Sequence, residues 1–400
     1  LRSPVTPEMR DSTRRRRQTA KEIKVKMVER SSGRRGFQKR GRLVVAVVLT
    51  LACLYLYYRM PPAPFDLANL SDEEKAELRK AEPALIANLT AHSPYRLGRF
   101  CDSGGDCFVV EQRYWMMRDG LHAQRLIMYE LNENMALTMA YLKTPEIITP
   151  HHLVHERWAV DPAILTFSYN LMQIAAGFML EGLTFARNDS QLQQPAQRVL
   201  QIGMGGGTAT GYLRTLPVEL HLDVVELEPE VYAAARRWFD FPDQSDKINV
   251  HIMDGVVFLK EAAESGLTYD SLILDAPSNA PNASIVCPHE VFLKEDVLDA
   301  MSKVIGSTGV LSVNLFMPDE QERLQEQVTR QFEAHFRSCS ALRILTNDQK
   351  FLACSNRDGF GWPAQRTRML ENLAVFDEIM GTSIAPYLDR LNPLSESFSP

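Results

Sequence analysis

A glycine-rich run is the first part of this sequence whose residue types suit ligand chemistry. The run Gly203-Met204-Gly205-Gly206-Gly207 follows a short apolar stretch and precedes a stretch of helical character. Glycines at such a turn allow positive φ and a close approach of backbone to ligand, and the following helix offers free N–H groups to a negatively charged group. The run alone is a weak signal, because it can also be only a tight turn.

Three acidic residues strengthen the signal. Glu226 ends a second apolar stretch about twenty residues further on, where a carboxylate can accept hydrogen bonds from both ribose hydroxyls of a nucleoside. Asp254 and Asp275 end the third and fourth apolar stretches. Each acid alone could be a helix cap or a solvated loop end, but together they border one crevice if the stretches are parallel strands. The predicted nucleoside site consists of Gly203, Gly205, Gly207, Glu226, Asp254, Gly255 and Asp275.

The elements that must position these residues alternate between strand and helix over residues 198–355. Strands are expected at RVLQIG, HLDVVELE, KINVHIMD, YDSLILD and GVLSVNLF, and ALRIL with FLACS is expected to form a closing hairpin. This alternation predicts an α/β fold, a doubly wound, Rossmann-like sheet of seven strands. Upstream, CFVVEQ, RLIMYE and MALTMAYL predict a small β-rich lead-in. A composition of 45% hydrophobic and 24% charged residues excludes a wholly disordered, collagen-like or coiled-coil chain.

A long apolar run connects the two parts. DPAILTFSYNLMQIAAGFMLEGL is expected to be a helix that begins at Asp161, since Asp followed by Pro is a favoured helix entry. A second membrane span is the rival interpretation. We expect a buried helix, because Ser168, Asn170 and Gln173 interrupt the apolar run and no charged flank sets an orientation.

The motifs resemble a known group. LQIGMGGGTAT, VVELEPEV, HIMDGVVFL and YDSLILDAPS, in this order, are similar to the class I S-adenosylmethionine-dependent methyltransferases of the spermidine-synthase-like branch, over roughly residues 155–355. Within that branch, the flanking runs look most like the carboxyl-terminal domain of the methyltransferase-like protein that acts on translation elongation factor 1-alpha. The resemblance implies S-adenosyl-L-methionine as cofactor, with Gly203, Gly205 and Gly207 around its methionine moiety, Glu226 on the ribose and Asp254 near the adenine amine.

Two departures favour methyl transfer over polyamine synthesis. Ser278 stands where the aminopropyltransferases of this branch carry a second acid after strand four, and Gly206 stands where their glycine loop has Asp. Without that second acid, activation of a polyamine amine is less expected. Methyl transfer asks less of the protein, because the sulfonium is already activated and the site chiefly aligns the two reactants. Asp275 is the candidate for orienting or deprotonating an acceptor, and Asn314 is a lesser one.

Two rival functions stay open, an aminopropyltransferase-like polyamine enzyme and a non-catalytic nucleoside-fold module that binds a partner. The expected ligands are the small-molecule cofactor and an acceptor that is a protein amine or a small molecule. Nucleic acid is not expected, and a homodimer is left open. His151, His152 and His155 could ligate a metal, but the sequence lacks the Glu of a zincin motif, so no metal is expected.

The amino-terminal region predicts a membrane anchor. Residues 1–42 hold 15 Lys/Arg against 4 Asp/Glu, and residues 43–58, LVVAVVLTLACLYLYY, carry no charge. By the positive-inside rule, a single span over 43–58 would leave the tail in the cytosol and the body in the lumen or outside, at the endoplasmic reticulum, the Golgi or the cell surface. A buried core helix is the alternative. Four glycosylation acceptors lie beyond the span, at Asn69, Asn88, Asn188 and Asn282.

The expected order of parts follows from these segments. It is a basic tail (1–42), a transmembrane signal-anchor (43–58), a stalk (59–95), the β-rich lead-in and helix (96–190), the methyltransferase domain (191–358) and a carboxyl-terminal tail (359–400). In the lead-in, Cys101 and Cys107 could close a small loop by a disulfide or stay reduced.

Overall fold

The computed structural model describes residues 67, 70–185, 196–242, 244–278, 283–317, 322–344 and 350–393. The described strands, and the described helices apart from the first residue of the helix Asp72–Ala91, lie within the compact unit Glu73–Pro400.

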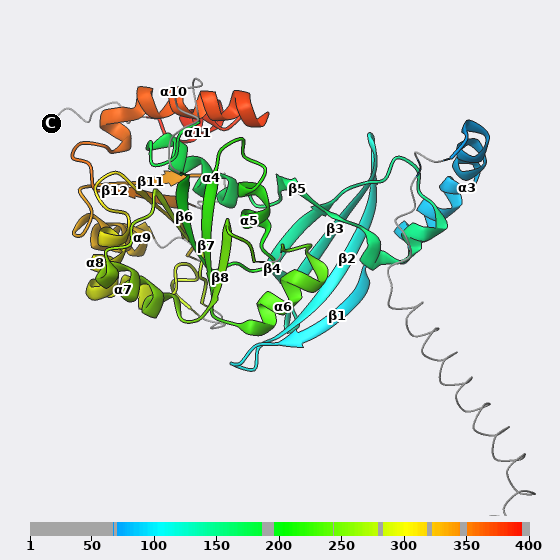
Figure 1. The fold of residues 1–400 in the computed structure, drawn as a ribbon, viewed down its shortest axis with the longest axis horizontal. Coiled ribbons are helices and arrows are strands. Elements are labelled where there is room, and N and C mark those ends of the chain that lie inside the picture. Colours follow the sequence, from blue (N-terminus) through cyan, green and yellow to red (C-terminus); the bar gives the residue numbers. More distant parts are fainter. Residues whose placement is uncertain are drawn as a thin grey trace, which may run out of the picture. The chain divides into compact units, whose positions relative to one another are not determined.

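A seven-stranded sheet forms the larger half of the unit (Figure 1). Its strand order is β11-β12-β10-β9-β6-β7-β8. The strands β10, β9, β6, β7 and β8 are parallel to one another. Strand β12 runs antiparallel to both of its neighbours, β10 and β11. The strands are β6 (Gln197–Ile202), β7 (Leu220–Glu226), β8 (Ile248–Ile252), β9 (Ser271–Leu274), β10 (Val310–Leu315), β11 (Ser338–Arg343) and β12 (Lys350–Ser355).

Helices cover both faces of this sheet, because its buried strands are apolar on both sides. In β6, Val199 packs on the face that α4, α5, α10 and α11 cover, whereas Leu200 packs on the face that α7, α8 and α9 cover. This two-residue alternation places successive side chains on opposite faces. The helices are α4 (Ser168–Met179), α5 (Thr208–Leu213), α6 (Pro229–Trp238), α7 (Gly255–Ser265), α8 (Glu295–Val304), α9 (Glu322–Glu333), α10 (Trp362–Met380) and α11 (Ala385–Leu391).

The β-rich lead-in is a second, five-stranded sheet. Its strands follow one another as an antiparallel meander: β1 (Tyr95–Cys101), β2 (Cys107–Met117), β3 (Gly120–Tyr129), β4 (Asn132–Leu142) and β5 (Val160–Leu165). Phe108 and Ile127 of this sheet pack with Trp238 and Phe239, at the end of α6. The buried Arg125 side chain donates a hydrogen bond to the backbone carbonyl of Trp238. An apolar cluster and a buried cation therefore join the two sheets.

In the apolar run that begins at Asp161, the helical part is buried, as expected, but the first part is a half-buried to exposed strand. Val160–Leu165 pairs with β4, and the helix begins only at Ser168. The prediction of a helix start at Asp161 is therefore wrong. Pro162 fits an edge strand, where its missing N–H costs no ladder hydrogen bond, and pairing with β4 overrides the local helix-entry signal. Nine of the twelve residues of α4 are buried.

The predicted transmembrane helix is the part of the fold that we correct. Within the described ranges, no helix combines the length and the apolar character that a membrane span requires. The predicted span, residues 43–58, lies outside the described residues. We therefore describe the fold as two sheets with their helices, and the single-pass anchor with a lumenal or extracellular body is not retained.

The regions expected as a stalk and a tail contribute to the core. Helix α3 (Asp72–Ala91) buries Leu89 against Tyr114 and Trp158 of the small sheet region. Leu373 and Phe376 of α10 are fully buried on the large sheet. The described residues contain two disulfides, Cys101–Cys107 and Cys339–Cys354, and a buried free thiol at Cys287.

Candidate functional site

The glycine run forms the tight connection between β6 and α5. Gly203, Gly205 and Gly207 all have positive φ, at 82°, 52° and 77°. A Cβ at Gly203 would lie 2.1 Å from the backbone oxygen of Asp275, so the loop and the end of β9 touch. Glycine is therefore required there both by conformation and by space.

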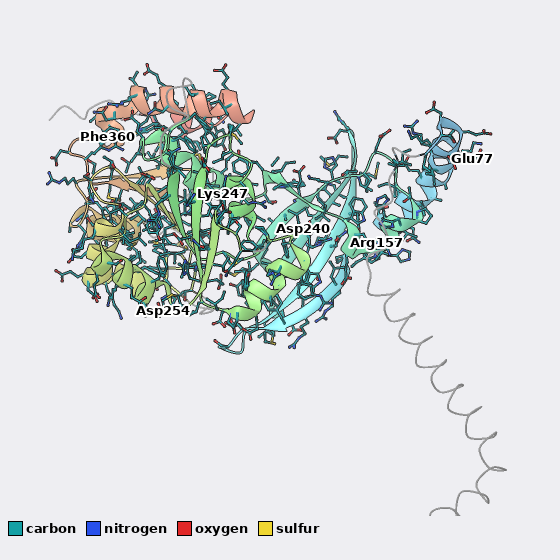
Figure 2. All side chains as sticks on the ribbon, viewed as in Figure 1. Glu77, Arg157, Asp240, Lys247, Asp254 and Phe360 are labelled. Atoms are coloured by element: carbon teal, nitrogen blue, oxygen red, sulfur yellow. A yellow bond between two sulfur atoms is a disulfide. The ribbon has the colours of Figure 1, made fainter. Side chains whose placement is uncertain are left out.

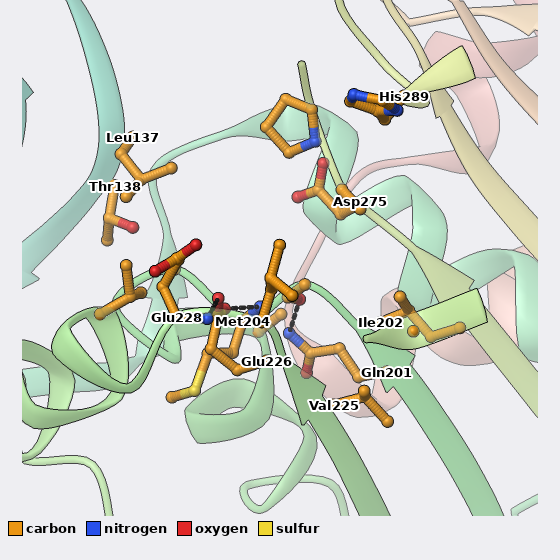
Figure 3. A pocket seen from close by; sticks show the side chains of 18 of the residues that line it. Leu137, Thr138, Gln201, Ile202, Met204, Val225, Glu226, Glu228, Asp275 and His289 are labelled. Atoms are coloured by element: carbon orange, nitrogen blue, oxygen red, sulfur yellow. Dashed lines mark hydrogen bonds between the residues drawn. The ribbon is translucent and has the colours of Figure 1, made fainter. Parts of the chain in front are cut away.

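Glu226 ends β7 directly beside this loop. Its carboxylate accepts hydrogen bonds from the N–H groups of Met204, at 3.1 Å, and Glu228, at 3.0 Å (Figure 3). The side chain is 8% exposed, and burial raises the pKa of its carboxyl group, against the lowering effect of the backbone hydrogen bonds. Each carboxylate oxygen keeps a further lone pair, so two hydroxyl donors of a ligand can still be accepted.

Asp254 differs in environment from Glu226. It is exposed, and Figure 2 shows it beside the large sheet. Its carboxylate caps α7 by accepting the Val256 N–H at 2.7 Å. Gly255 follows it, and a Cβ there would lie 2.7 Å from the side chain of Ile202. Asp254 thus acts as a helix cap and also borders the cavity.

Asp275, after β9, is the centre of a polar cluster. Asn314 donates to one of its carboxylate oxygens at 3.0 Å, and Asn170 of α4 donates to the other at 3.1 Å. Tyr169 adds a side-chain hydrogen bond, and the Cys287 thiol lies 3.8 Å from the carboxylate. Burial raises the pKa of the Asp275 carboxyl group, although these four hydrogen-bonding neighbours act in the opposite direction.

One cavity of about 330 Å³ brings these residues together. Six of the seven residues predicted for the nucleoside site line it, together with Tyr169, Asn170 and Thr138, whereas Gly207 is not one of its lining residues. Figure 3 shows Glu226, Asp275 and Thr138 of this set. Asn314 is not among the described lining residues, and it reaches the site through its hydrogen bond to Asp275. The volume is in the range of small-molecule sites.

The charge of the cavity wall is one-sided. Its acidic residues are Asp102, Glu226, Glu228, Asp254 and Asp275, and it also holds His289 and Tyr169. Within the described part of the chain, no Lys or Arg lines it. Ionised carboxylates in a concave, partly apolar site create a negative electrostatic potential in its interior, and that potential attracts cations.

The small sheet closes one side of the cavity. Thr138 of β4 accepts a hydrogen bond from the Gly206 N–H at 2.7 Å. Ser103, in the loop that the Cys101–Cys107 disulfide closes, donates to Glu228 through both its N–H and its hydroxyl, each at 2.8 Å. The lead-in sheet is therefore part of the site.

The sequence alone did not identify the residues that reach the cavity from outside the large sheet. Thr138 carried no signal, because nothing in its neighbourhood marks it as different from other strand residues. Asn170 carried one, since a polar side chain in a nearly apolar helix requires a buried partner. His289 also lines the cavity, and its ring nitrogen accepts the Val291 N–H at 3.2 Å.

The three histidines considered for metal binding are held in other ways. The His152 ring accepts the Thr149 N–H, and the His155 ring is 2.9 Å from the Tyr114 hydroxyl. The His151 ring lies 2.8 Å from Arg157, and burial lowers the pKa of all three.

Part of the chain is similar to known proteins. Residues 189–349 match the spermine/spermidine synthase domain, which confirms the resemblance to the spermidine-synthase-like branch. The eEF1A lysine and N-terminal methyltransferase of Xenopus laevis is 30% identical over 148 residues, which are 37% of this chain and 21% of that protein. A polyamine aminopropyltransferase of Vibrio vulnificus is 34% identical over 120 residues, 30% of this chain and 38% of that enzyme. The matched region thus spans well under half the length of either relative.

Among solved structures, human methyltransferase-like protein 13 in complex with SAH aligns with 58% of this chain and 97% of its own. The TM-score is 0.46 and the sequence identity is 23%.

Proposed function

We propose that this chain is an S-adenosylmethionine-dependent methyltransferase of the spermidine-synthase-like branch, and that it transfers the methyl group to an amine. The observation that carries the proposal is Glu226, a buried carboxylate at the end of β7 that faces the same cavity as the glycine loop. The match of residues 189–349 and the similarity to an eEF1A lysine and N-terminal methyltransferase support it.

The residues present fit this cofactor. Glu226 would accept from the ribose hydroxyls, Asp254 and Gly255 would lie at the adenine side, and Gly203 to Gly207 would surround the methionine moiety. Gly203 and Gly205 have no side chain between the loop backbone and the cavity that they line. The bound cofactor supplies an activated methyl group on a sulfonium centre, which is itself a cation suited to the acidic wall.

Asp275 is the residue that we propose acts on the acceptor. Asn314 donates a hydrogen bond to one carboxylate oxygen and Asn170 donates to the other. These two bonds fix the orientation of the Asp275 carboxylate. A carboxylate whose pKa is raised is a better proton acceptor than an ordinary one, so Asp275 can take a proton from an ammonium acceptor. Asn314 and Asn170 are then positioning residues.

We propose a protein amine as the acceptor. Amine chemistry agrees with the acidic cavity wall, since an amine reaches the site as a cation. The named substrate of the similar methyltransferases, eEF1A, is the first protein to test.

The charge of the wall also favours a second candidate, transfer of an aminopropyl group from decarboxylated S-adenosylmethionine. That ligand lacks the carboxylate of the intact cofactor and is more cationic, so a wall with five acids and no described Lys or Arg suits it. The similarity to the Vibrio aminopropyltransferase supports this candidate. Ser278 in place of the second acid, and Gly206 in place of Asp, oppose it.

Calorimetric titration of the full chain with intact and with decarboxylated S-adenosylmethionine tests both candidates. Glu226→Gln is compared with Glu219→Gln, because Glu219 is an exposed acid just before the opposite end of the same strand. We expect tighter binding of the intact cofactor, a loss of roughly tenfold or more in Glu226→Gln, and wild-type affinity in Glu219→Gln.

Methyl transfer is then measured with labelled cofactor and eEF1A, in wild type and Asp275→Asn. Label in eEF1A that depends on Asp275 supports the proposal. Preference for the decarboxylated form would replace it by aminopropyl transfer, and binding of neither form would leave a partner-binding module.

A further inference from the structure

Thr138 lies at the point where the small sheet meets the glycine loop. Its side chain is 4% exposed, lines the cavity, and accepts the Gly206 N–H through its hydroxyl oxygen at 2.7 Å. A hydroxyl that accepts in this way still has its own proton to donate. Within the described ranges, no side chain or carbonyl receives that proton, so the acceptor that the geometry leaves for it is a ligand in the cavity.

The composition of the cavity wall limits which protein groups can bind the carboxylate of a ligand. Intact S-adenosylmethionine carries one carboxylate, and the five acids of the wall repel it. Since the wall of described residues contains no Lys or Arg, the carboxylate depends on neutral donors. Thr138 is such a donor, and its bond to Gly206 holds it beside the loop proposed to surround the methionine moiety.

Thr138 also explains the glycine at position 206. A Cβ at Gly206 would lie 2.6 Å from the Thr138 methyl carbon and 3.0 Å from the ring of Phe239. An Asp at this position, as in the aminopropyltransferases, would meet both side chains. The methyl group of Thr138 and the ring of Phe239 therefore leave no room for an acid at position 206.

From these contacts we propose that Thr138 is a specificity-determining residue that donates a hydrogen bond to the carboxylate of S-adenosylmethionine and so favours the intact cofactor over its decarboxylated form. This inference rests on the proposed function. The residue comes from β4, outside the matched segment 189–349.

The test compares Thr138→Val, which removes the hydroxyl at nearly constant shape, with Thr138→Ser, which keeps it. Full-length wild type and both variants are titrated calorimetrically with intact and with decarboxylated S-adenosylmethionine. Methylthioadenosine, which lacks the whole amino-acid end, reports whether the nucleoside part of each variant site is intact. Intact and decarboxylated S-adenosylmethionine both carry the chain that the glycine loop is proposed to surround, so loss of the Gly206 hydrogen bond affects these two ligands alike. The ratio of their two affinities therefore isolates the carboxylate contact.

We expect Thr138→Val to reduce the preference for intact over decarboxylated cofactor roughly tenfold, the size of one hydrogen bond to a charged group. Thr138→Ser should keep the wild-type ratio. An unchanged ratio in Thr138→Val overturns the inference while the proposed function stands, provided that Glu226 is still required. If wild type binds neither form of the cofactor, both the inference and the proposed function fail.

Discussion

Gly203→Ala measures how strongly the contact between the glycine loop and β9 constrains the fold. Gly203 has φ +82°, and an added Cβ would lie 2.1 Å from the Asp275 carbonyl oxygen and 2.8 Å from its carbonyl carbon. Neither backbone can move freely, because Gly203 donates to Val225 and Asp275 donates to Ile202, both at 2.9 Å. Alanine therefore introduces both an unfavourable φ and a backbone clash.

Gly266→Ala is the matched control. Gly266 ends α7 with φ +72°, and a Cβ there meets nothing within 4 Å. A left-handed alanine costs about 1–2 kcal/mol, and the smaller entropy of the unfolded chain offsets part of that, so about 1 kcal/mol remains. Relieving the clash at Gly203 by shifting backbone adds about 1–3 kcal/mol. We therefore expect free energies of unfolding lower by about 1 kcal/mol for Gly266→Ala and about 3 kcal/mol for Gly203→Ala.

Urea denaturation, followed by tryptophan fluorescence and extrapolated linearly to water, measures both values. Gly203→Ala should also lose S-adenosylmethionine binding, whereas Gly266→Ala should keep it. If the two variants agree within about 0.5 kcal/mol, a size typical of surface substitutions, the close approach does not constrain the loop and our reasoning about Gly203 is refuted.

Three further predictions follow from burial, charge and cross-linking. Because burial raises the pKa of Glu226 and a cationic ligand favours the ionised form, binding releases a proton, and affinity for S-adenosylmethionine should rise with pH through that pKa. In titrations at several pH values, the affinity for S-adenosylmethionine should change less with pH in Glu226→Gln than in wild type, and equal slopes of affinity against pH would contradict this. Leu373→Ala, at a fully buried position of α10, should lower the free energy of unfolding by about 2–5 kcal/mol. Val375→Ala, at a position 39% exposed on the same helix, should cost under about 1 kcal/mol in the same urea assay, and similar losses would disprove the packing argument. Replacing both Cys339 and Cys354 by Ser should lower the free energy of unfolding by about 3 kcal/mol, because the disulfide closes a loop with a sequence separation of 15 and restricts the unfolded chain. An unchanged urea midpoint would argue against the cross-link.

The sheet and the acidic residues could be predicted because both depend on local patterns. Apolar strands that alternate with helices determine a parallel sheet, and the carboxyl ends of parallel strands meet at one edge. Glu226, Asp254 and Asp275 follow three such strands, so their common edge needed no tertiary information. Their environments could not be predicted in the same way. Glu226 is buried whereas Asp254 is an exposed helix cap, a difference set by neighbours distant in sequence.

Contacts between elements account for what the sequence did not predict. Asp161 and Pro162 form a favourable helix entry, but the strand pairing of Val160–Leu165 with β4 outweighs it. Asn170 lies 105 residues before Asp275, and only the packing of α4 on the large sheet brings the two together. Thr138 reaches the glycine loop because the small sheet packs against the end of α6, an arrangement that no local pattern encodes.

These contacts argue that the lead-in and the methyltransferase domain expected at residue 191 are one functional unit. A fragment that begins at residue 191 would leave the Gly206 N–H without Thr138 and the Asp275 carboxylate without Asn170 and Tyr169. Loss of those donors would raise the cost of a buried Asp275 charge and open one side of the cavity to water. Since the cofactor and acceptor roles that we propose depend on that wall, the small sheet belongs to the site in the same sense as the glycine loop does.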